Sequence, residues 1–326
     1  MLKPLISILI PVFNRADLIA QTVDCALAQD YSNFEIIVVN NASTDETWSV
    51  LQELYSSNPK VRLFSNDSNV GPVKNWLRCV EAAKGEYAKI LWSDDLISSD
   101  FLSKTSNLMR PEVGFVFTQA SVFTANPMEG VLCHYLGSTR YLTSEDFITR
   151  DFAGLNTPLS PGCALFRLPD IKECLFQDIP NPINSDFSMH AIGNDLLLFL
   201  LVAKKYRFVG YVGEVLSFFR AHEGSISISS IPGKLPAHYN LARAYFAQQH
   251  RPDLLTRLNA RLYADCLRYP DFKSYNLLSF SDFYFSPMDE GVSFTFLVMM
   301  ICKRILVRVG TVFRKLTLPK NSRGSF

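Results

Sequence analysis

The sequence lacks the cysteine spacings of a disulfide framework and of a zinc site. It has seven cysteines, an odd number, and no two of them are spaced as Cys-x-x-Cys. Small disulfide-bonded domains carry paired cysteines, and structural zinc sites use closely spaced ones. The pattern argues against both classes and is typical of a protein from a reducing cytosol.

The chain also lacks an excess of charge of either sign. Its formal net charge is +1 at pH 7, and the first 290 residues contain no basic stripe interleaved with aromatic side chains. Such a stripe is the usual electrostatic footprint of a nucleic-acid-binding domain. We therefore expect no nucleic-acid partner.

Long apolar runs, internal repeats and low-complexity stretches are absent as well. The apolar run that ends at Cys302 is about ten residues long, too short to cross a bilayer. The apolar run at 5–13 has no small-residue cleavage site and leads directly into polar, helix-starting residues. It therefore predicts a buried strand and not a secretion signal.

What the chain does contain is a regular alternation of predicted strands and helices. Apolar runs rich in Ile and Val predict strands at 5–13, 34–40, 61–64 and 87–92. Helical spacing and start signals predict helices at about 17–29, 46–55 and 72–83. Strand and helix alternate four times in the first 95 residues. This alternation favours an α/β fold with a mostly parallel sheet, flanked by helices.

Two adjacent carboxylates, Asp94 and Asp95, follow the fourth predicted strand. Open α/β sheets bind ligands in the crevice beyond the carboxyl ends of their strands. Two acids there repel each other unless a cation joins them, and Mg²⁺ or Mn²⁺ is typically held by one or two carboxylates plus substrate phosphate oxygens. The pair therefore predicts a divalent-cation site. The alternative is an acidic turn in which Asp95 or a neighbouring serine caps the next helix.

Several sequence segments occur in a recognisable order. They are SILIPVFNR, FEIIVVNNASTD, NVGPVKN, GEYAKILWSDD, PGCALFR, GNDL and FFRAHEGSIS. Their order resembles the inverting family 2 glycosyltransferases of the GT-A (Rossmann-like) fold, over roughly residues 5–225. The resemblance implies an enzyme that transfers a sugar from a nucleotide-diphosphate sugar to a hydroxyl group, with inversion at the anomeric carbon. It also implies that 161–167 border the acceptor pocket.

The resemblance implies a nucleoside-binding set at the ends of the first two strands. Its members are Pro11, Val12, Asn40 and Asn41. The family usually has an acid at the position of Asn40, where a carboxylate accepts the proton of pyrimidine N3. An asparagine can still accept with its carbonyl oxygen, but it also donates and carries no charge.

The resemblance also implies a metal and diphosphate site. Asp95, aided by Asp94, would bind a Mn²⁺ or Mg²⁺ cofactor that bridges the diphosphate oxygens of the donor. Arg220 would pair with a phosphate, and His222 would ligate the metal or hydrogen-bond the diphosphate. Lys74 either reaches the donor phosphates or lies on a solvated helix face.

Asp195 is the candidate general base, in the segment that resembles the acidic motif of the family. The usual motif is Glu-Asp, whereas this chain has Asn194 before Asp195. The departures at Asn40 and Asn194 keep open a second hypothesis, a catalytically idle GT-A module that binds a glycan or a partner. A third hypothesis, a nucleotidyltransferase, lacks support because no Gly-rich basic loop follows the first strand.

The chain is long enough for one large domain and an appendage. We expect a glycosyltransferase domain over 1–228, with 1–98 binding the nucleotide-sugar and 99–228 forming the acceptor side. A helical region over 229–326 would follow. We expect the acceptor to be a glycan or a lipid-linked glycan in polysaccharide or lipopolysaccharide synthesis.

The last part of the chain has an asymmetric charge. From Gly291 onward there is no acidic residue, while seven basic side chains lie among bulky apolar ones. This pattern is typical of an amphipathic helix in the interface of an anionic membrane. The alternative is a helix packed on the catalytic domain. The sequence thus predicts a cytoplasmic enzyme that is peripheral on the inner face of the cell membrane, or simply soluble.

Overall fold

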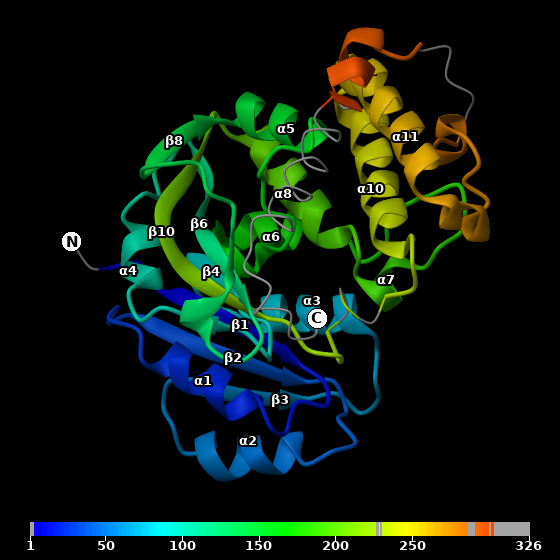
Figure 1. The fold of residues 1–326 in the computed structure, drawn as a ribbon. Coiled ribbons are helices and arrows are strands. Elements are labelled where there is room, and N and C mark those ends of the chain that lie inside the picture. The colour runs from blue at the N-terminus through cyan, green and yellow to red at the C-terminus, as the bar shows by residue number, and fades with distance from the viewer. Residues whose placement is uncertain (1–2, 226–227, 229, 286–290, 300, 303–326) are drawn as a thin grey trace, which may run out of the picture.

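The computed structural model describes residues 3–225, 228, 230–285, 291–299 and 301–302. Its first part forms the parallel half of one large sheet (Figure 1). The strands here are β1 (Ile6–Val12), β2 (Phe34–Asn40), β3 (Val61–Ser65) and β4 (Tyr87–Ile90). The helices are α1 (Ile19–Leu27), α2 (Thr47–Tyr55) and α3 (Pro72–Ala82). All three helices lie inside the ranges predicted from the sequence.

The second part of the chain makes the sheet mixed. Its strands are β5 (Leu96–Ile97), β6 (Val113–Phe123), β7 (Val131–Cys133), β8 (Arg140–Thr143), β9 (Ala164–Arg167) and β10 (Phe208–Arg220). The main path of the sheet runs β3-β2-β1-β4-β9-β6-β10-β5, with β7 on β6 and β8 on β10. Strand β9 is antiparallel to both of its neighbours, β4 and β6. It therefore joins the parallel half of the sheet to the strands of the second part.

Further helices cover and extend this half. The α-helices are α4 (Phe101–Ser106), α5 (Ser144–Phe152), α6 (Leu168–Cys174), α7 (Phe187–His190), α8 (Asn194–Lys205), α10 (Lys234–His250) and α11 (Leu255–Arg268). Short 3₁₀ turns occupy Pro127–Glu129, Pro161–Cys163, Pro252–Leu254, Pro270–Tyr275 and Phe280–Phe283. Among the described residues, no helix is both long and apolar enough to cross a membrane.

The alternation of side chains along β1 explains why helices cover both faces of the sheet. Ile6, Ile8 and Ile10 belong to one buried cluster, which also contains apolar residues of α1. Leu9 points to the other cluster, which contains the apolar face of α3. Successive side chains of a strand face opposite sides, so a strand that is apolar throughout must be covered twice.

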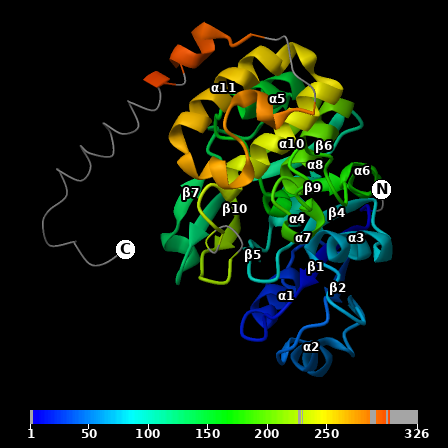
Figure 2. The same ribbon diagram turned by 90° about the vertical axis from the view of Figure 1, so that its right-hand side faces the viewer.

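The core continues beyond residue 228. Helix α8 is buried from Asn194 to Ala203, and it packs against α10. Apolar side chains of α10 and α11, including Leu241 and Leu258, belong to the same cluster as those of α3 and α8. Figure 2 shows α10 and α11 against the α8 side of the sheet. The boundary at 228/229 stays a prediction, and the helices after it belong to the same core cluster as α3 and α8.

Candidate active site

Asp94 and Asp95 lie in a turn between β4 and β5. Strand β4 ends at Ile90, two residues earlier than predicted, and the Asp95 N–H closes the turn on the Trp92 carbonyl at 3.1 Å. The Thr22 hydroxyl of α1 donates to the Asp95 carbonyl at 3.0 Å. The turn is thus fixed from both sides, and the two carboxylates point in different directions.

The Asp95 carboxylate is directed into the protein. It is buried, and its Oδ1 accepts the backbone N–H of Arg220 at 2.8 Å. Burial, and then the neighbouring Asp94 carboxylate, raise the pKa of Asp95 well above its ordinary value, against the opposing effects of the Arg220 N–H and of Lys89. Asp95 therefore joins the end of β4 to the end of β10.

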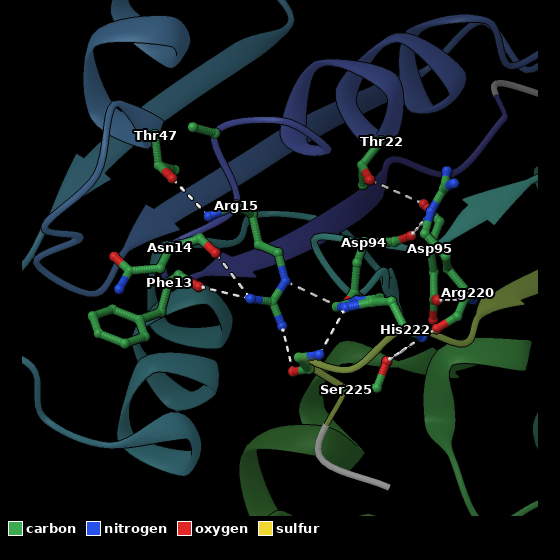
Figure 3. A network of polar contacts seen from close by, with 12 residues as sticks. Phe13, Asn14, Arg15, Thr22, Thr47, Asp94, Asp95, Arg220, His222 and Ser225 are labelled. Carbon is green, nitrogen blue, oxygen red and sulfur yellow. Dashed lines mark hydrogen bonds and ion pairs between the residues drawn. The ribbon is translucent and has the colours of Figure 1, made fainter. Parts of the chain in front are cut away.

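The Asp94 carboxylate faces the opposite way, toward Arg15 and His222. Its Oδ2 accepts from Arg15 Nε at 3.2 Å and lies 2.9 Å from His222 Nε2 (Figure 3). The sequence analysis paired Asp95 with His222 as metal ligands. The structure instead brings His222 to Asp94, because the carboxylate of Asp95 is turned away and is held by β10.

His222 lies just beyond β10, in a turn that its own side chain closes. The Gly224 N–H donates to His222 Nδ1 at 3.1 Å, and the His222 N–H donates to the Ser225 hydroxyl at 3.2 Å. Since Nδ1 accepts, these hydrogen bonds assign the remaining ring proton to Nε2, which donates it to Asp94. Strand β10 ends at Arg220, so Arg220 and His222 do not share one strand face.

The Arg220 guanidinium is held by the protein at two of its nitrogens and on one of its faces. Its Nε donates to the Asp94 carbonyl at 3.0 Å, and its Nη2 donates to Gln21 Oε1 at 2.9 Å. The guanidinium also lies over the Phe123 ring, 4.8 Å from the centroid. In this structure Arg220 fixes the backbone of Asp94, and its predicted phosphate contact stays a prediction.

The predicted nucleoside set lies at the carboxyl ends of β1 and β2. Pro11 and Val12 are buried in β1, and the Val12 carbonyl accepts the Asn41 N–H at 2.8 Å. Asn40 donates to the Ser65 hydroxyl at 3.1 Å and accepts the Ser43 N–H at 3.2 Å. These contacts join β1, β2 and β3 at the edge where a nucleoside is expected.

The side chain of Asn41 has a structural role. Its Nδ2 donates to Asn69 and to the Gly71 carbonyl, and its Oδ1 accepts from Asn66 and from the Val70 N–H. An asparagine amide offers two donor hydrogens and two acceptor lone pairs, and all four are used here. Asn41 thus holds the 66–71 loop, which leaves only its backbone for the predicted nucleoside contact.

Lys74 is exposed on α3, while the neighbouring Asn75 is buried. Asn75 donates to the Val39 carbonyl at 3.0 Å, so it anchors α3 to β2. The helix begins after Gly71, whose φ of +84° suits glycine. Lys74 stands on the solvent side of this helix, and its predicted contact with donor phosphates stays a prediction.

Asp195 lies at the start of α8 and is buried. Its Oδ1 accepts the N–H groups of Gly193 at 3.0 Å and Leu196 at 2.8 Å, and its Oδ2 accepts the Tyr239 hydroxyl at 2.9 Å. Burial raises the pKa of Asp195 to about 6, against these hydrogen bonds, which lower it. An acid with such a pKa is poised for proton transfer near neutral pH.

The preceding Asn194 is fully buried and has no access to a substrate. Its Nδ2 donates to the carbonyls of Phe176 and Gln177, and its buried Oδ1 has no hydrogen-bond partner among the described residues. Asn194 therefore anchors α8 to the preceding loop, while Asp195 supplies the acidic group.

The segment 161–167 lies next to the Asp94 turn. The Trp92 indole N–H donates to the Ser160 hydroxyl at 2.8 Å, and the Trp92 ring lies on Trp76 of α3 with centroids 4.6 Å apart. Below them, the buried Lys89 ammonium donates to the Gly162 carbonyl. The predicted acceptor border is thus tied to the same turn that carries Asp94.

A family model described as glycosyl transferase family 2 matches residues 7–175, more than half of the chain. The chain belongs to this family. Family membership confirms the prediction of a glycosyltransferase at that level, and it leaves the nucleotidyltransferase hypothesis without support.

Relatives within the family cover the chain to different extents. An uncharacterized glycosyltransferase of Haemophilus influenzae is 36% identical over 106 residues, which are 32% of this chain and 42% of that protein. The putative colanic acid biosynthesis glycosyl transferase WcaA of Escherichia coli is 26% identical over 258 residues, 74% of this chain and 82% of that protein. The chain therefore spans less than half of the length of the first relative and most of the second.

The fold is similar to that of S. aureus TarS, residues 1–349, in complex with UDP. The TM-score is 0.61 at 16% sequence identity, and the similarity covers 85% of this chain and 79% of that chain. At this identity the likeness concerns the fold. It confirms the predicted GT-A class, and the sheet is mixed as a whole and parallel in its first half.

Asp94 and His222 fit a metal ion of the predicted kind. Among the described residues, no cluster of three or more His, Cys, Asp and Glu side chains could hold a metal. A Mg²⁺ or Mn²⁺ ion that travels with a nucleotide needs only one or two protein ligands, because phosphate oxygens supply others. The Asp94 carboxylate and the adjacent His222 imidazole match that requirement. His222 Nε2 could ligate the ion once its proton has left, either to Nδ1 in place of the Gly224 contact or to another base.

Sequence reasoning missed two residues of this family 2 site, Arg15 and Tyr239. Arg15 stands in the SILIPVFNR segment, but nothing in a linear sequence pairs it with Asp94. Tyr239 lies in α10, beyond the matched family region, in a stretch where the sequence shows no chemistry. The only sequence signal for Tyr239 was its position on an apolar helix face, because a buried tyrosine hydroxyl requires a hydrogen-bond partner.

Proposed function

We propose that this chain is a metal-dependent inverting glycosyltransferase. It transfers a sugar from a nucleotide-diphosphate sugar to a hydroxyl of a glycan or lipid-linked acceptor in surface polysaccharide or lipopolysaccharide assembly. The observation that carries the proposal is the pairing of two groups of opposite character. Asp94, Arg15 and His222 meet at the proposed diphosphate end, and Asp195 is a buried acid with no ion-pair partner among the described residues.

The diphosphate end binds and orients the leaving group. Asp94 and His222 would hold the divalent cation, which supplies Lewis-acid stabilisation of the negative charge that grows on the diphosphate. Arg220 fixes the Asp94 backbone through its carbonyl, and Asp95 fixes the end of β10. These contacts preorganise the charged groups, so that little rearrangement is needed as the sugar–diphosphate bond breaks.

The acceptor end moves one proton. As the acceptor hydroxyl attacks the anomeric carbon from the face opposite the diphosphate, the Asp195 carboxylate takes the hydroxyl proton. A base with a pKa of about 6 is ionised at pH 7 and can still accept a proton. Direct displacement without a covalent enzyme intermediate inverts the anomeric centre.

A panel of nucleotide-sugars tests this proposal. The protein is incubated with UDP-, dTDP- and GDP-sugars and Mn²⁺, and release of nucleoside diphosphate is followed with and without candidate acceptors. We expect slow hydrolysis with one donor class and its loss in EDTA. If the protein neither binds nor hydrolyses any of the donors, the second hypothesis holds instead, a catalytically idle GT-A module.

The nucleoside diphosphate itself gives a second test. Mn²⁺ plus the matching nucleoside diphosphate should raise the melting temperature of the wild-type protein, and Asp94→Asn should abolish the metal-dependent part. Asp95→Ala should lower the melting temperature of the free protein instead, because it removes the acceptor of the Arg220 N–H inside the fold. Equal metal-dependent stabilisation in wild type and Asp94→Asn would refute the assignment of Asp94.

We also propose that the enzyme is peripheral on the inner face of the cell membrane. The described part of the C-terminal segment exposes several large apolar side chains, Phe294, Val298, Met299 and Ile301. Its backbone is tied to the domain by the Ser293 N–H on the Thr256 carbonyl and by Asn259 on the Gly291 carbonyl. The seven basic residues, from Lys303 to Arg323, lie outside the described residues.

Vesicle binding tests this location. The full chain should bind anionic vesicles at low salt and partly dissociate at high salt, because each basic residue near the surface contributes about 1 kcal/mol. A chain ending at Glu290 should stay folded and lose vesicle binding. If that shorter chain unfolds, or if the full chain ignores anionic vesicles, the segment is part of the core instead.

A further inference from the structure

Arg15 makes contacts that bring three separate parts of the site together. It follows β1, and its backbone N–H donates to the Thr47 hydroxyl at 2.7 Å. Its guanidinium reaches the Asp94 carboxylate through Nε at 3.2 Å and the Gly224 carbonyl through Nη2 at 3.2 Å (Figure 3). The loop after β1, the turn after β4 and the turn after β10 thus meet at one guanidinium.

The position of this guanidinium coincides with that of the expected cation. Arg15 Nε and His222 Nε2 contact the same oxygen of Asp94, Oδ2. A divalent cation held by Asp94 and His222 would lie next to that oxygen. Two cations within a few ångströms repel strongly in a partly buried site, and Arg15 and Asp94 are 22% and 15% exposed at their side chains. Arg15 and the metal would therefore compete for Asp94 Oδ2.

The other contacts of the Arg15 guanidinium are with neutral groups. Nη1 donates to the Asn14 carbonyl at 2.9 Å and to the Phe13 carbonyl at 3.5 Å, and Nη2 donates to the Gly224 carbonyl. Once Asp94 is taken by a cation, no carboxylate remains among these partners. A diphosphate oxygen is then the stronger acceptor, since charged pairs form stronger hydrogen bonds and the guanidinium fork matches phosphate geometry.

Arg220 has no part in this exchange, and its predicted phosphate contact does not depend on it. Its guanidinium is bound by Gln21 and the Asp94 carbonyl and lies on Phe123, so no carboxylate has to release it. Arg15, in contrast, is paired with the Asp94 carboxylate, which is the proposed ligand of the divalent cation.

We propose that Arg15 is a ligand of the donor diphosphate which Asp94 holds until a divalent cation displaces it. The inference rests on the proposed function, because it takes a nucleoside diphosphate and a divalent cation as the ligands. In the free protein Arg15 neutralises Asp94. In the loaded protein the cation takes Asp94, and the Arg15 guanidinium turns to the diphosphate.

The test compares Arg15→Gln, Arg15→Lys and a control, Arg62→Gln. Arg62 also pairs with a carboxylate, Glu35 at 3.0 Å, but its other contact is with the end of α3 and not with the site. Binding of Mn²⁺ alone is measured by electron paramagnetic resonance. Binding of UDP, GDP and dTDP at saturating Mn²⁺ is measured by calorimetry, and melting temperatures confirm that the variants fold.

We expect opposite effects on the two ligands. Arg15→Gln should bind Mn²⁺ alone about three- to tenfold more tightly, because no cation has to leave Asp94, and should bind the nucleoside diphosphate at least about tenfold more weakly. Arg15→Lys should bind Mn²⁺ like the wild type and the nucleoside diphosphate more weakly, since an ammonium lacks the fork. Arg62→Gln should change neither.

Two results would overturn the inference while leaving the proposed function standing. One is a wild-type protein that binds Mn²⁺ and a nucleoside diphosphate, with Arg15→Gln binding both equally well. The other is weaker Mn²⁺ binding in Arg15→Gln, which would make Arg15 a support for Asp94. A folded wild-type protein that binds neither Mn²⁺ nor any of the three nucleotides would overturn the proposed function and this inference together.

Discussion

Helix α10 meets two buried carboxylates one turn apart and provides them with different partners. Tyr239 and Arg243 are four residues apart, so they lie on one face of the helix. Tyr239 donates to Asp195 of α8 at 2.9 Å. Arg243 donates to both oxygens of Asp151, the last turn of α5, at 2.7 and 2.8 Å. One acid thus has a neutral partner and the other a cation.

The two carboxylates differ in pKa as a result. Burial would raise the pKa of Asp151, but the Arg243 guanidinium, together with Arg261 and the Thr157 hydroxyl, lowers that pKa below its ordinary value. Burial raises the pKa of Asp195 to about 6, because hydrogen bonds alone do not compensate for the lost water. Asp151 therefore stays ionised in a buried ion pair that stabilises the fold. Asp195, beside the phenol of Tyr239, has a raised pKa and so a higher affinity for a proton.

Substitution of Asp195, the acid whose partner is the neutral Tyr239, should have the largest effect on the rate of sugar transfer. Asp195→Asn should retain nucleotide-sugar binding and lose transfer by about 10²- to 10⁴-fold, because the base is gone while the donor site is intact. Initial rates at saturating donor measure the loss. Asp186→Asn is the matched control, since Asp186 caps the short helix α7 and is exposed. Near-normal turnover in Asp195→Asn would assign the base elsewhere.

Substitution of Asp151, the acid whose partner is the cationic Arg243, should have the largest effect on stability. Asp151→Asn leaves the buried Arg243 without its counter-charge, which should cost about 3–5 kcal/mol of unfolding free energy. Urea denaturation followed by circular dichroism measures it. The exposed pair of Asp146 and Arg150, at 2.8 Å, offers the control, and Asp146→Asn should cost less than about 1 kcal/mol. Equal costs in the two variants would contradict the comparison.

The stability effect of Asp195→Asn should have the opposite sign and depend on pH. The pKa of Asp195 is about 6 in the folded protein, above the ordinary 3.8. Its contribution to stability is therefore fully present below pH 3.8 and is lost as the pH rises through 6. Relative to wild type, Asp195→Asn should be about 2–3 kcal/mol more stable at pH 8, and the gain should vanish near pH 4. Denaturation curves at both pH values decide the sign.

The smallest expected effect concerns the phenol itself. Tyr239→Phe removes a hydrogen bond that lowers the pKa of Asp195, so that pKa should rise above about 6. The acidic limb of the kcat/KM profile should move up by about one pH unit, with little change in rate at pH 8.5. A uniform loss of rate at every pH, with the limb unmoved, would give Tyr239 a packing role alone.

The first half of the fold was predictable because its signals are local. Continuous apolar runs predicted β1 to β4, and helical spacing with Pro72 as a start signal predicted α1 to α3. The alternation of these elements predicted parallel pairing. The mixed character of the sheet was not predictable, because the antiparallel insertion of β9 between β4 and β6 joins segments far apart in the sequence.

The candidate site was predictable in its segments and less so in its side chains. Asp94, Asp195, Arg220 and His222 all lie at the ends of elements, as expected. Which of two adjacent acids faces His222 depends on the turn after β4, and the sequence analysis chose Asp95 where the structure brings Asp94. The roles of Asn40, Lys74, Asp95 and Asp195 toward ligands stay predictions.

The sequence by itself determined the element order of the first half, the family and the segments that carry charge, because hydrophobic periodicity and short motifs are properties of neighbouring residues. Only the tertiary structure decided which charges meet. Arg15 and Gly224 are 209 residues apart, and Tyr239 and Asp195 are 44 apart. Such contacts form when packed helices and strands place their side chains at a common point, and burial there sets whether an acid holds the fold or takes a proton.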